Sequence, residues 1–149
     1  MSGTAIAVER VDHIGIRVRD LERALAFSRL LGFELRHKVD FDAVAIIAND
    51  ADVEINLIYN ANAGDPKRNI LMDVPEKYAG YTHVALRVAS IADTIAALKA
   101  HGIVITQGPV TFGDGHVSVF VRDPDRNVIE LRGRGVDAAG IEGVKPYVP

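Results

Sequence analysis

The 149-residue sequence contains no cysteine and no tryptophan. Without cysteine the chain has no disulfide framework, no thiolate nucleophile and no thiolate-ligated zinc. It also lacks an excess of basic charge, since 17 Lys and Arg residues stand against 20 Asp and Glu residues. Nucleic-acid binding requires a clustered basic face, so this balance argues against a nucleic-acid partner.

Long hydrophobic runs are missing as well. No apolar run approaches the roughly 20 residues that a membrane helix needs, so no membrane partner is expected. Residues 1–10 lack the basic segment and apolar stretch of a secretory signal. Hydrophobic residues make up 48% of the chain and charged residues 25%, which is close to the globular average. These features predict one folded domain over residues 1–149, located in the cytoplasm.

One stretch of the sequence occurs twice. Residues 11–33 and 81–103 align without a gap, and hydrophobic positions match between the identities. Such a match predicts an internal duplication. A repeat of this kind constrains the overall fold more strongly than local sequence patterns do. The identical pairs are His13 with His83, Arg17 with Arg87, Val18 with Val88, Ala26 with Ala96, and Gly32 with Gly102.

Each copy predicts the order strand, helix, strand, strand, strand. Alternating apolar residues favour the first strands at 11–19 and 82–88, and Asp20 and Ser90 are candidate N-caps of the helices that follow. The remaining strands are expected at 33–41, 43–48 and 53–60 in the first copy, and at 103–106, 116–121 and 127–132 in the second.

Segments rich in turn residues divide these elements. Module one spans about residues 8–60 and module two about residues 80–134, with a connector at 61–79 that carries a short helical turn near 70–73. Turns are expected at 108–109 and 113–115, and residues 123–126 should join a hairpin. The tail, residues 135–149, is expected to be ordered only if it docks on another element.

Three of the potential metal-binding side chains in these strands form the candidate ligand set. Alternation places His13, His83 and Glu130 on strand faces opposite to apolar residues. A lone strand histidine is usually packed or solvated. The duplication, however, puts the two histidines at equivalent points of two related sheets. Two imidazoles and one carboxylate form a set that suits a divalent transition metal.

Three segments resemble the vicinal oxygen chelate superfamily: VDHIGIRV (11–18), YTHVALRV (81–88) and DPDRNVIEL (123–131). This superfamily includes glyoxalase I, extradiol dioxygenases, acyl-CoA epimerases and resistance proteins for fosfomycin and bleomycin. The resemblance covers about residues 8–134. It implies an α+β fold in which two tandem βαβββ modules form a metal-binding cup, the glyoxalase/bleomycin resistance/dioxygenase fold. It also implies that His13, His83 and Glu130 bind one divalent ion (Fe, Mn, Ni, Zn or Co).

The fourth ligand position distinguishes branches of the superfamily. Aligning residues 128–131 with 54–57 pairs Glu130 with Asn56, where glyoxalase I has a glutamate. Asn56 can ligate a metal through its carbonyl oxygen, or hold a neighbouring ligand, but it cannot act as a general base. Glu54, two residues earlier on the same strand face, is the alternative ligand if the strand bulges.

Other positions bear on substrate and chemistry. Arg17 and Asn60 match the glyoxalase I pattern in which such residues anchor the glutathione carboxylate, although Arg87 shows that the repeat itself favours arginine there. His116 is a candidate proton shuttle, with a solvated hairpin histidine as the alternative. Phe120 occupies the place where extradiol dioxygenases typically have a tyrosine, which argues against ring cleavage.

The resemblance implies a metal-dependent lyase or isomerase of the glyoxalase or epimerase type. Its metal would chelate vicinal oxygens of a small substrate, such as a glutathione conjugate, and stabilise an enediolate or enolate. Glu130 would bind the metal and move the proton. The alternatives are an Fe(II) or Mn(II) dioxygenase, a thiol transferase, and a non-catalytic drug-binding resistance protein, the last disfavoured by the intact ligand set. A homodimer is expected.

Overall fold

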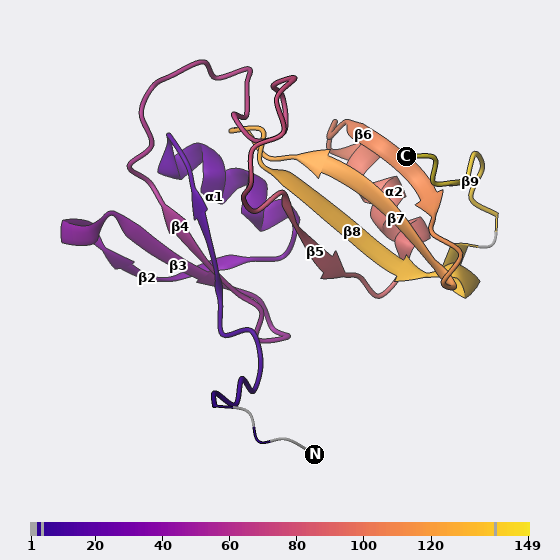
Figure 1. The fold of residues 1–149 in the computed structure, drawn as a ribbon, viewed down its shortest axis with the longest axis horizontal. Helices are drawn as coiled ribbons and strands as arrows, with labels where there is room; N and C mark the ends of the chain where they lie inside the picture. The colour runs from indigo at the N-terminus through magenta and orange to yellow at the C-terminus, as the bar shows by residue number, and fades with distance from the viewer. Residues whose placement is uncertain (1–2, 4, 139) are drawn as a thin grey trace. The chain divides into compact units, whose positions relative to one another are not determined.

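The computed structural model describes residues 3, 5–138 and 140–149, and it forms two compact units, Met1–Asn62 and Ala63–Pro149. Each unit combines one β-sheet with one α-helix of ten residues (Figure 1). The α+β fold predicted from the sequence is therefore confirmed. Residues 1, 2 and 4 of the predicted domain and residue 139 of the predicted tail lie outside the described residues.

The first unit contains a four-stranded sheet in the order β1-β4-β3-β2. Strand β1 runs parallel to β4, while the other neighbours are antiparallel. The elements are β1 (Ile14–Arg17), α1 (Leu21–Leu30), β2 (Glu34–Val39), the short 3-10 helix η1 (Asp40–Asp42), β3 (Val44–Ala48) and β4 (Glu54–Ile58).

Helix α1 begins where the sequence predicted, directly after Asp20. The Asp20 side chain accepts a hydrogen bond of 2.8 Å from the Arg23 amide, which satisfies a donor of the first turn. Gly32 follows the helix with a φ of 88°, a left-handed conformation that glycine adopts without a Cβ clash. Alternation along β4 buries Ile55 and Leu57 and leaves Glu54 and Asn56 half-buried on the opposite face.

The second unit contains a five-stranded sheet in the order β5-β8-β7-β6-β9. Strand β5 is parallel to β8, and β9 is parallel to β6. The elements are β5 (His83–Arg87), α2 (Ile91–Ala100), β6 (Ile105–Thr111), β7 (His116–Arg122), β8 (Val128–Arg134), the 3-10 helix η2 (Gly135–Ala138) and β9 (Lys145–Pro146).

Helix α2 packs closely on strand β8. The Ser90 hydroxyl accepts a hydrogen bond from the Asp93 amide at 3.1 Å and caps the helix as predicted. The first helical residue, Ile91, is completely buried. A Cβ atom at Gly133 would lie 2.9 Å from the Ile91 Cβ, so this approach requires glycine in β8.

The duplication is visible in the backbone pairing of the two sheets. In the first unit the parallel ladder pairs Gly15 with Asn56, and in the second unit it pairs Ala85 with Glu130. His13 precedes the first strand of its ladder, and His83 begins the first strand of the other. Asn56 and Glu130 therefore occupy equivalent backbone positions, in the register that the sequence alignment predicted.

A local expectation at residues 108–109 was wrong, and another at residues 70–73 was confirmed. Residues 108–109 do not form a turn but lie within β6, at a register shift between Gln107 and Val110. Pairing with β7 overrides the local turn preference of Gly-Pro, and a Cβ at Gly108 would lie 2.5 Å from the Ser118 carbonyl oxygen. Residues 70–73 lie in the predicted short helical turn, which a hydrogen bond of 2.8 Å from the Asp73 amide to the Asn69 carbonyl oxygen closes.

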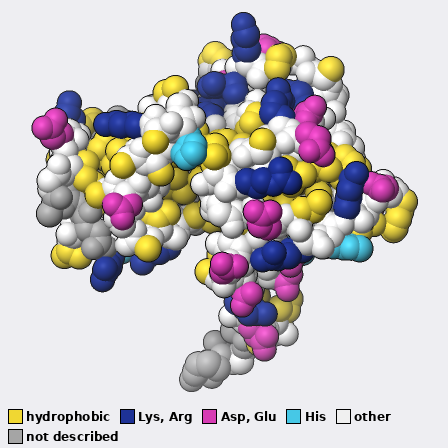
Figure 2. All heavy atoms as spheres, turned by 180° about the vertical axis from the view of Figure 1, so that it is seen from behind, with side chains coloured by type: hydrophobic (Ala, Val, Ile, Leu, Met, Phe, Trp, Pro, Cys, Tyr) yellow, Lys and Arg dark blue, Asp and Glu magenta, His cyan; other side chains and the backbone are white. Residues whose placement is uncertain are grey.

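The molecular surface carries mixed charge. On the face shown in Figure 2, Lys and Arg side chains are interspersed with Asp and Glu side chains and with hydrophobic groups. Within residues 3, 5–138 and 140–149, no helix has the length and apolar character needed to cross a membrane.

Candidate functional site

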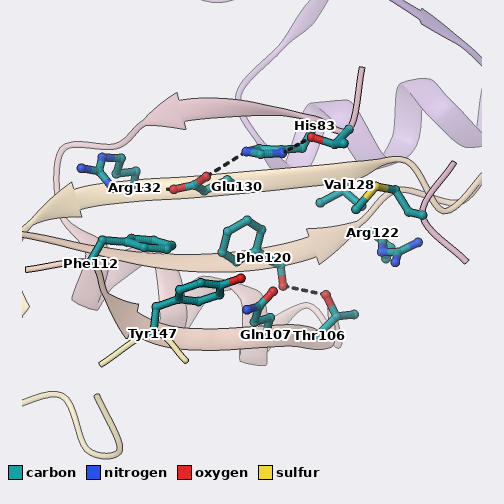
Figure 3. Close-up of a pocket in the computed structure, with 12 residues that line it drawn as sticks. His83, Thr106, Gln107, Phe112, Phe120, Arg122, Val128, Glu130, Arg132 and Tyr147 are labelled. Carbon is teal, nitrogen blue, oxygen red and sulfur yellow. Dashed lines mark hydrogen bonds and ion pairs between the residues drawn. The ribbon is translucent and has the colours of Figure 1, made fainter. Parts of the chain in front are cut away.

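The second unit contains a cavity of about 590 Å³ on the face of its sheet (Figure 3). Residues of strands β5, β7 and β8 form one part of the lining. Residues of β6, together with the residues that directly follow β6 and β9, form another part. This volume lies within the range of small-molecule sites. The side chains that line it include His83, Phe112, Phe120, Glu130, Arg132 and Tyr147.

His83 and Glu130 meet at this cavity. Their nearest atoms, Nε2 of His83 and Oε1 of Glu130, are 3.1 Å apart. The other ring nitrogen of His83, Nδ1, lies 2.8 Å from the Thr82 hydroxyl. Thr82 thereby orients the ring and leaves Nε2 directed at the carboxylate (Figure 3). The structure thus brings together two of the four predicted metal ligands within one unit.

Glu130 is held firmly in place from β7. The carboxylate is only 7% exposed, and its Oε2 accepts a hydrogen bond of 2.6 Å from the fully buried Ser118 hydroxyl. The Arg132 guanidinium lies 3.8 Å from the same oxygen. Arg132 also binds Asp114, and this hydrogen bond lowers the pKa of the Asp114 carboxyl. A buried carboxylate with these partners has one oxygen fixed and the other available to a ligand.

His13 has a similar arrangement in the first unit. Its Nδ1 lies 2.7 Å from the Asp12 carboxylate, the residue that corresponds to Thr82 in the repeat. This hydrogen bond lowers the pKa of Asp12. Glu54 Oε2 lies 3.8 Å from the same ring nitrogen. In both units the residue before the histidine therefore engages Nδ1, which leaves Nε2 as the nitrogen for a ligand.

Asn56 has a buried side-chain oxygen without a protein partner. Among the described residues, its Oδ1 makes no hydrogen bond although it has no accessible surface. A buried carbonyl oxygen without a donor is unfavourable unless a bound group satisfies it. A cation is one group that would satisfy this oxygen.

The two predicted substrate anchors, Arg17 and Asn60, lie next to each other. Arg17 Nε donates a hydrogen bond of 3.1 Å to the Asn60 side-chain oxygen. Arg17 ends β1, and Asn60 follows the strand paired with it, so the parallel register brings them together. Both side chains are exposed.

His116 begins β7 and is not among the described residues that line the cavity. Its Nδ1 lies 3.2 Å from the Asp114 carbonyl oxygen and 3.7 Å from the Asp114 carboxylate. The ring is therefore engaged by the preceding turn. Its role as a proton shuttle stays a prediction.

Asp73 fixes the predicted connector to the β7–β8 hairpin. Its carboxylate accepts hydrogen bonds from Arg122 at 3.0 and 3.1 Å and from Arg126 at 2.8 and 3.2 Å. These two guanidinium groups hold the pKa of Asp73 well below its usual range. Because Arg122 also lines the cavity, this clamp positions part of the cavity wall.

Several residues of this site have no role in the sequence analysis. Ser118, Thr82, Phe112 and Tyr147 hold the two ligands or line the cavity. Alternation along β7 could have placed Ser118 on the same face as Phe120. Tyr147 carries no such signal, because β9 is only two residues long.

Residues 10–131 match the family model described as "Glyoxalase/Bleomycin resistance protein/Dioxygenase superfamily". The chain is 31% identical over 144 residues to a "Probable lactoylglutathione lyase" of Vibrio cholerae, which covers 90% of this chain and 97% of that protein. It is also 31% identical over 129 residues to a "Lactoylglutathione lyase" of Haemophilus influenzae, covering 80% of this chain and 88% of that protein.

Solved structures show the same fold. A glyoxalase/dioxygenase from Nostoc punctiforme superposes with a TM-score of 0.68 at 20% identity, covering 89% of this chain and 99% of that one. A glyoxalase family protein from Bacillus cereus has a TM-score of 0.63 at 17% identity, covering 89% and 99%. At these identities the likeness concerns the fold alone. Together with the family model, it shows that the chain belongs to the glyoxalase/bleomycin resistance protein/dioxygenase superfamily.

Proposed function

We propose that this chain is a divalent-metal-dependent lyase of the glyoxalase type, acting on the hemithioacetal of glutathione and a 2-oxoaldehyde. The observation that carries the proposal is the His83–Glu130 pair, a 3.1 Å contact between an oriented imidazole and a buried carboxylate at a cavity. The relatives named as lactoylglutathione lyases support the substrate class.

The proposed metal ligands are His13 and Asn56 of the first unit and His83 and Glu130 of the second. The residue types suit a divalent ion: two imidazoles, a carboxylate and an amide oxygen, the last buried in its own unit without a hydrogen-bond partner among the described residues. When bound, a divalent cation acts as a Lewis acid that polarises neighbouring substrate oxygens and stabilises the negative charge that develops on them.

Glu130 is the proposed proton carrier. Ser118 fixes its Oε2, so Oε1 is the oxygen that would remove a proton from the carbon bearing the hydroxyl and sulfur. Return of the same proton to the adjacent carbon, with transfer of the hydroxyl proton to the former carbonyl oxygen, would convert the hemithioacetal to a 2-hydroxy thioester without any other reactant. Asn56 cannot perform this transfer, because an amide has no basic site near neutral pH. The base would therefore be supplied by the second unit.

Arg17 and Asn60 are proposed to bind the glutathione part of the substrate. Their mutual hydrogen bond of 3.1 Å orients the guanidinium, which can hold a carboxylate with two parallel hydrogen bonds. The predicted homodimer and cytoplasmic location are also part of the proposal. Light scattering of the purified chain tests the dimer.

The decisive experiment combines metal analysis with an activity assay. The purified chain is reconstituted in turn with Fe, Mn, Ni, Zn and Co, and thioester formation from methylglyoxal and glutathione is followed. We expect one or more metals to bind in a one-to-one ratio and to support turnover. His83→Ala should abolish metal binding, whereas His101→Ala, at the exposed end of α2, should retain it.

Glu130→Gln tests the proton carrier directly. The amide is nearly isosteric but cannot carry the proton, so kcat should fall by roughly 100-fold or more. Glu34→Gln, an exposed carboxylate in β2, is the matched control. Absence of metal binding under all conditions, or turnover of a catechol without hemithioacetal isomerisation, would contradict the proposal.

A further inference from the structure

The segment that precedes β1 carries exposed apolar side chains and is called here the arm, residues 5–11. Its three large apolar residues, Ile6, Val8 and Val11, are 79%, 84% and 75% exposed. In the described part of the chain, the arm belongs to no helix or strand and makes no backbone hydrogen bond. Figure 1 shows this segment leading away from the first sheet. Three large apolar residues exposed within six positions indicate a segment that binds another protein surface.

The second unit contains a smaller hollow of about 300 Å³, called here the connector groove. Its lining shares no described residue with the cavity at His83 and Glu130. Among the lining residues, Ile70 and Tyr78 are 74% and 66% exposed. This volume is at the lower limit of small-molecule sites, and the lining is open to solvent. The residues that form the groove all belong to the connector: Arg68, Ile70, Leu71, Val74, Glu76 and Tyr78.

Hydrogen bonds within the connector fix the shape of this groove. The Asn69 side-chain oxygen accepts hydrogen bonds from the Leu71 amide at 2.9 Å and from the Met72 amide at 3.0 Å. The Asp73 amide donates a hydrogen bond of 2.8 Å to the Asn69 carbonyl oxygen, and two arginines of the β7–β8 hairpin bind the Asp73 carboxylate. Because the backbone is already held in place, an occupant of the groove does not have to order it.

The charges of the groove are complementary to those of the arm. Arg68 and Glu76 are exposed, and neither side chain makes an ion pair within the described part of the chain. The arm carries one charge of each sign, at Glu9 and Arg10. Successive side chains of an extended segment point in opposite directions, so Glu9 can reach Arg68 while Arg10 reaches Glu76. The arm therefore offers both the apolar groups and the charges that this groove lacks.

We propose that the arm of one copy docks in the connector groove of a second copy, with Ile6 and Val8 against the apolar lining. Every copy carries both the arm and the groove, so a twofold pair of chains makes this contact twice. The apolar contacts supply most of the affinity, and the ion pairs at the edge of the groove orient the arm. The inference assigns contacts to the predicted homodimer and does not depend on the proposed lyase activity.

The absence of cysteine permits a direct test, because introduced cysteines are then the only thiols. Val8→Cys and Tyr78→Cys are purified separately, one of them isotope-labelled, and are then mixed and oxidised. We expect the main cross-linked product to join one labelled and one unlabelled chain, since a disulfide forms only where two Cβ atoms approach closely. Val8→Cys mixed with Val104→Cys is the control, because Val104 is 73% exposed in the second unit and lies outside the groove lining.

The same cross-link also shows which copy the arm occupies. A mixed disulfide no more abundant than in the control would overturn the proposal. In the chain that carries both Val8→Cys and Tyr78→Cys, a disulfide formed only within one copy would overturn it as well, because the arm would then dock on its own chain.

Charge reversal tests the orientation of the arm. Arg10→Glu and Glu76→Arg each bring like charges together, and each should raise the dissociation constant of the dimer by roughly tenfold in sedimentation experiments. The chain with both changes should recover most of the lost affinity, as expected for two groups in contact. Lys77→Glu, at an exposed position outside the groove lining, should have little effect. Losses that simply add in the double variant would overturn the pairing of Arg10 with Glu76.

Removal of an apolar contact separates this inference from the proposed function. Ile6→Asp should weaken association by roughly 100-fold, because an apolar contact made twice is replaced by a charge. Val104→Asp should leave association unchanged, and thermal unfolding of both variants should match the parent. A dimer of unaltered affinity in Ile6→Asp would reject the arm, and so would a parent chain that is monomeric at every concentration. Absence of hemithioacetal isomerisation, with the mixed disulfide intact, would reject the proposed function and retain the arm.

Discussion

Ser118 donates a hydrogen bond of 2.6 Å to Glu130 from the neighbouring strand, and Ser118 has no exposed surface. The bond fixes one carboxylate oxygen, so the other is oriented toward His83. Residues that orient a metal ligand contribute to metal affinity, and Glu130 is a proposed ligand.

Replacement of Ser118 by alanine should therefore weaken metal binding by roughly 10- to 100-fold. It should also lower the free energy of unfolding by about 1–3 kcal/mol, because a buried carboxylate oxygen loses its donor. Metal titration and chemical denaturation measure the two effects. Ser28→Ala, at a buried serine of α1, is the control, and equal metal affinity in both variants would show that Ser118 does not orient the carboxylate.

Replacement of Asn56 by glutamate should strengthen metal binding by about tenfold, because a charged oxygen ligand replaces a neutral one. Without metal, the variant should be less stable than the parent chain, since a carboxylate would be buried without a partner. Added metal should then raise the melting temperature of Asn56→Glu more than that of the parent. The rate of hemithioacetal isomerisation should also rise in Asn56→Glu. An unchanged rate would show that position 56 does not determine which reaction a member of the family catalyses.

Glu54→Gln is the matched variant for position 56. Glu54 approaches the Nδ1 edge of His13, which Asp12 already occupies, so its loss should leave metal affinity nearly unchanged. A large loss of affinity in Glu54→Gln, with none in Asn56→Ala, would instead identify Glu54 as the ligand of the first unit.

Removal of the Arg17 side chain should affect substrate binding more than chemistry. Arg17→Ala should raise KM for the hemithioacetal roughly 10- to 100-fold with little change in kcat, as expected when a charged hydrogen bond present throughout the reaction is lost. Arg87→Ala changes the equivalent arginine of the second repeat. Equal effects of the two variants would show that the repeat, and not the substrate, requires arginine at this position.

Asp73 should stabilise the second unit in a pH-dependent manner. The side chain is 16% exposed, and Arg126 and Arg122 lower its pKa in the folded state. A carboxyl group whose pKa is lowered by folding stabilises the protein at pH values above its pKa in the unfolded state, which is roughly 3.9 for aspartate. This stabilisation is lost as the pH falls through the pKa of the folded state.

Asp73→Asn should consequently lower the free energy of unfolding at neutral pH by about 1–3 kcal/mol. The difference in unfolding free energy between the variant and the parent chain should narrow as the pH falls below roughly 4. Below that pH, Asp73 of the unfolded parent chain takes up a proton, which favours unfolding of the parent. Urea denaturation across pH measures this, with Asp50→Asn in an exposed turn as the control. A difference that stays constant down to strongly acidic pH would exclude the ionised clamp as its source.

Local chemistry explains most of the elements that the sequence predicts. Asp20 and Ser90 cap their helices because their side chains accept first-turn amides, a contact between residues three apart. The alignment of Asn56 with Glu130 also follows from sequence, because strand alternation and the repeat determine the register. His83 and Glu130 lie 3.1 Å apart, and their role as metal ligands stays a prediction.

Long-range contacts explain what the sequence does not reveal. The Asp73 clamp joins residues that are far apart in the chain, and neither partner carries a local pattern. Pairing with β7 keeps residues 108–109 in a strand despite their turn preference. Tyr147 reaches the cavity through a two-residue strand, too short for any periodicity.

The equivalent ladders also bear on how the two halves diverged. Since Gly15–Asn56 and Ala85–Glu130 are the same backbone pair in two copies, the chemical difference at this position resides in the side chains alone. An ancestral duplicated chain could lose or regain an acid at either position by a few nucleotide changes, with no rearrangement of the main chain. At this position either half could therefore carry the carboxylate while every strand stays in place.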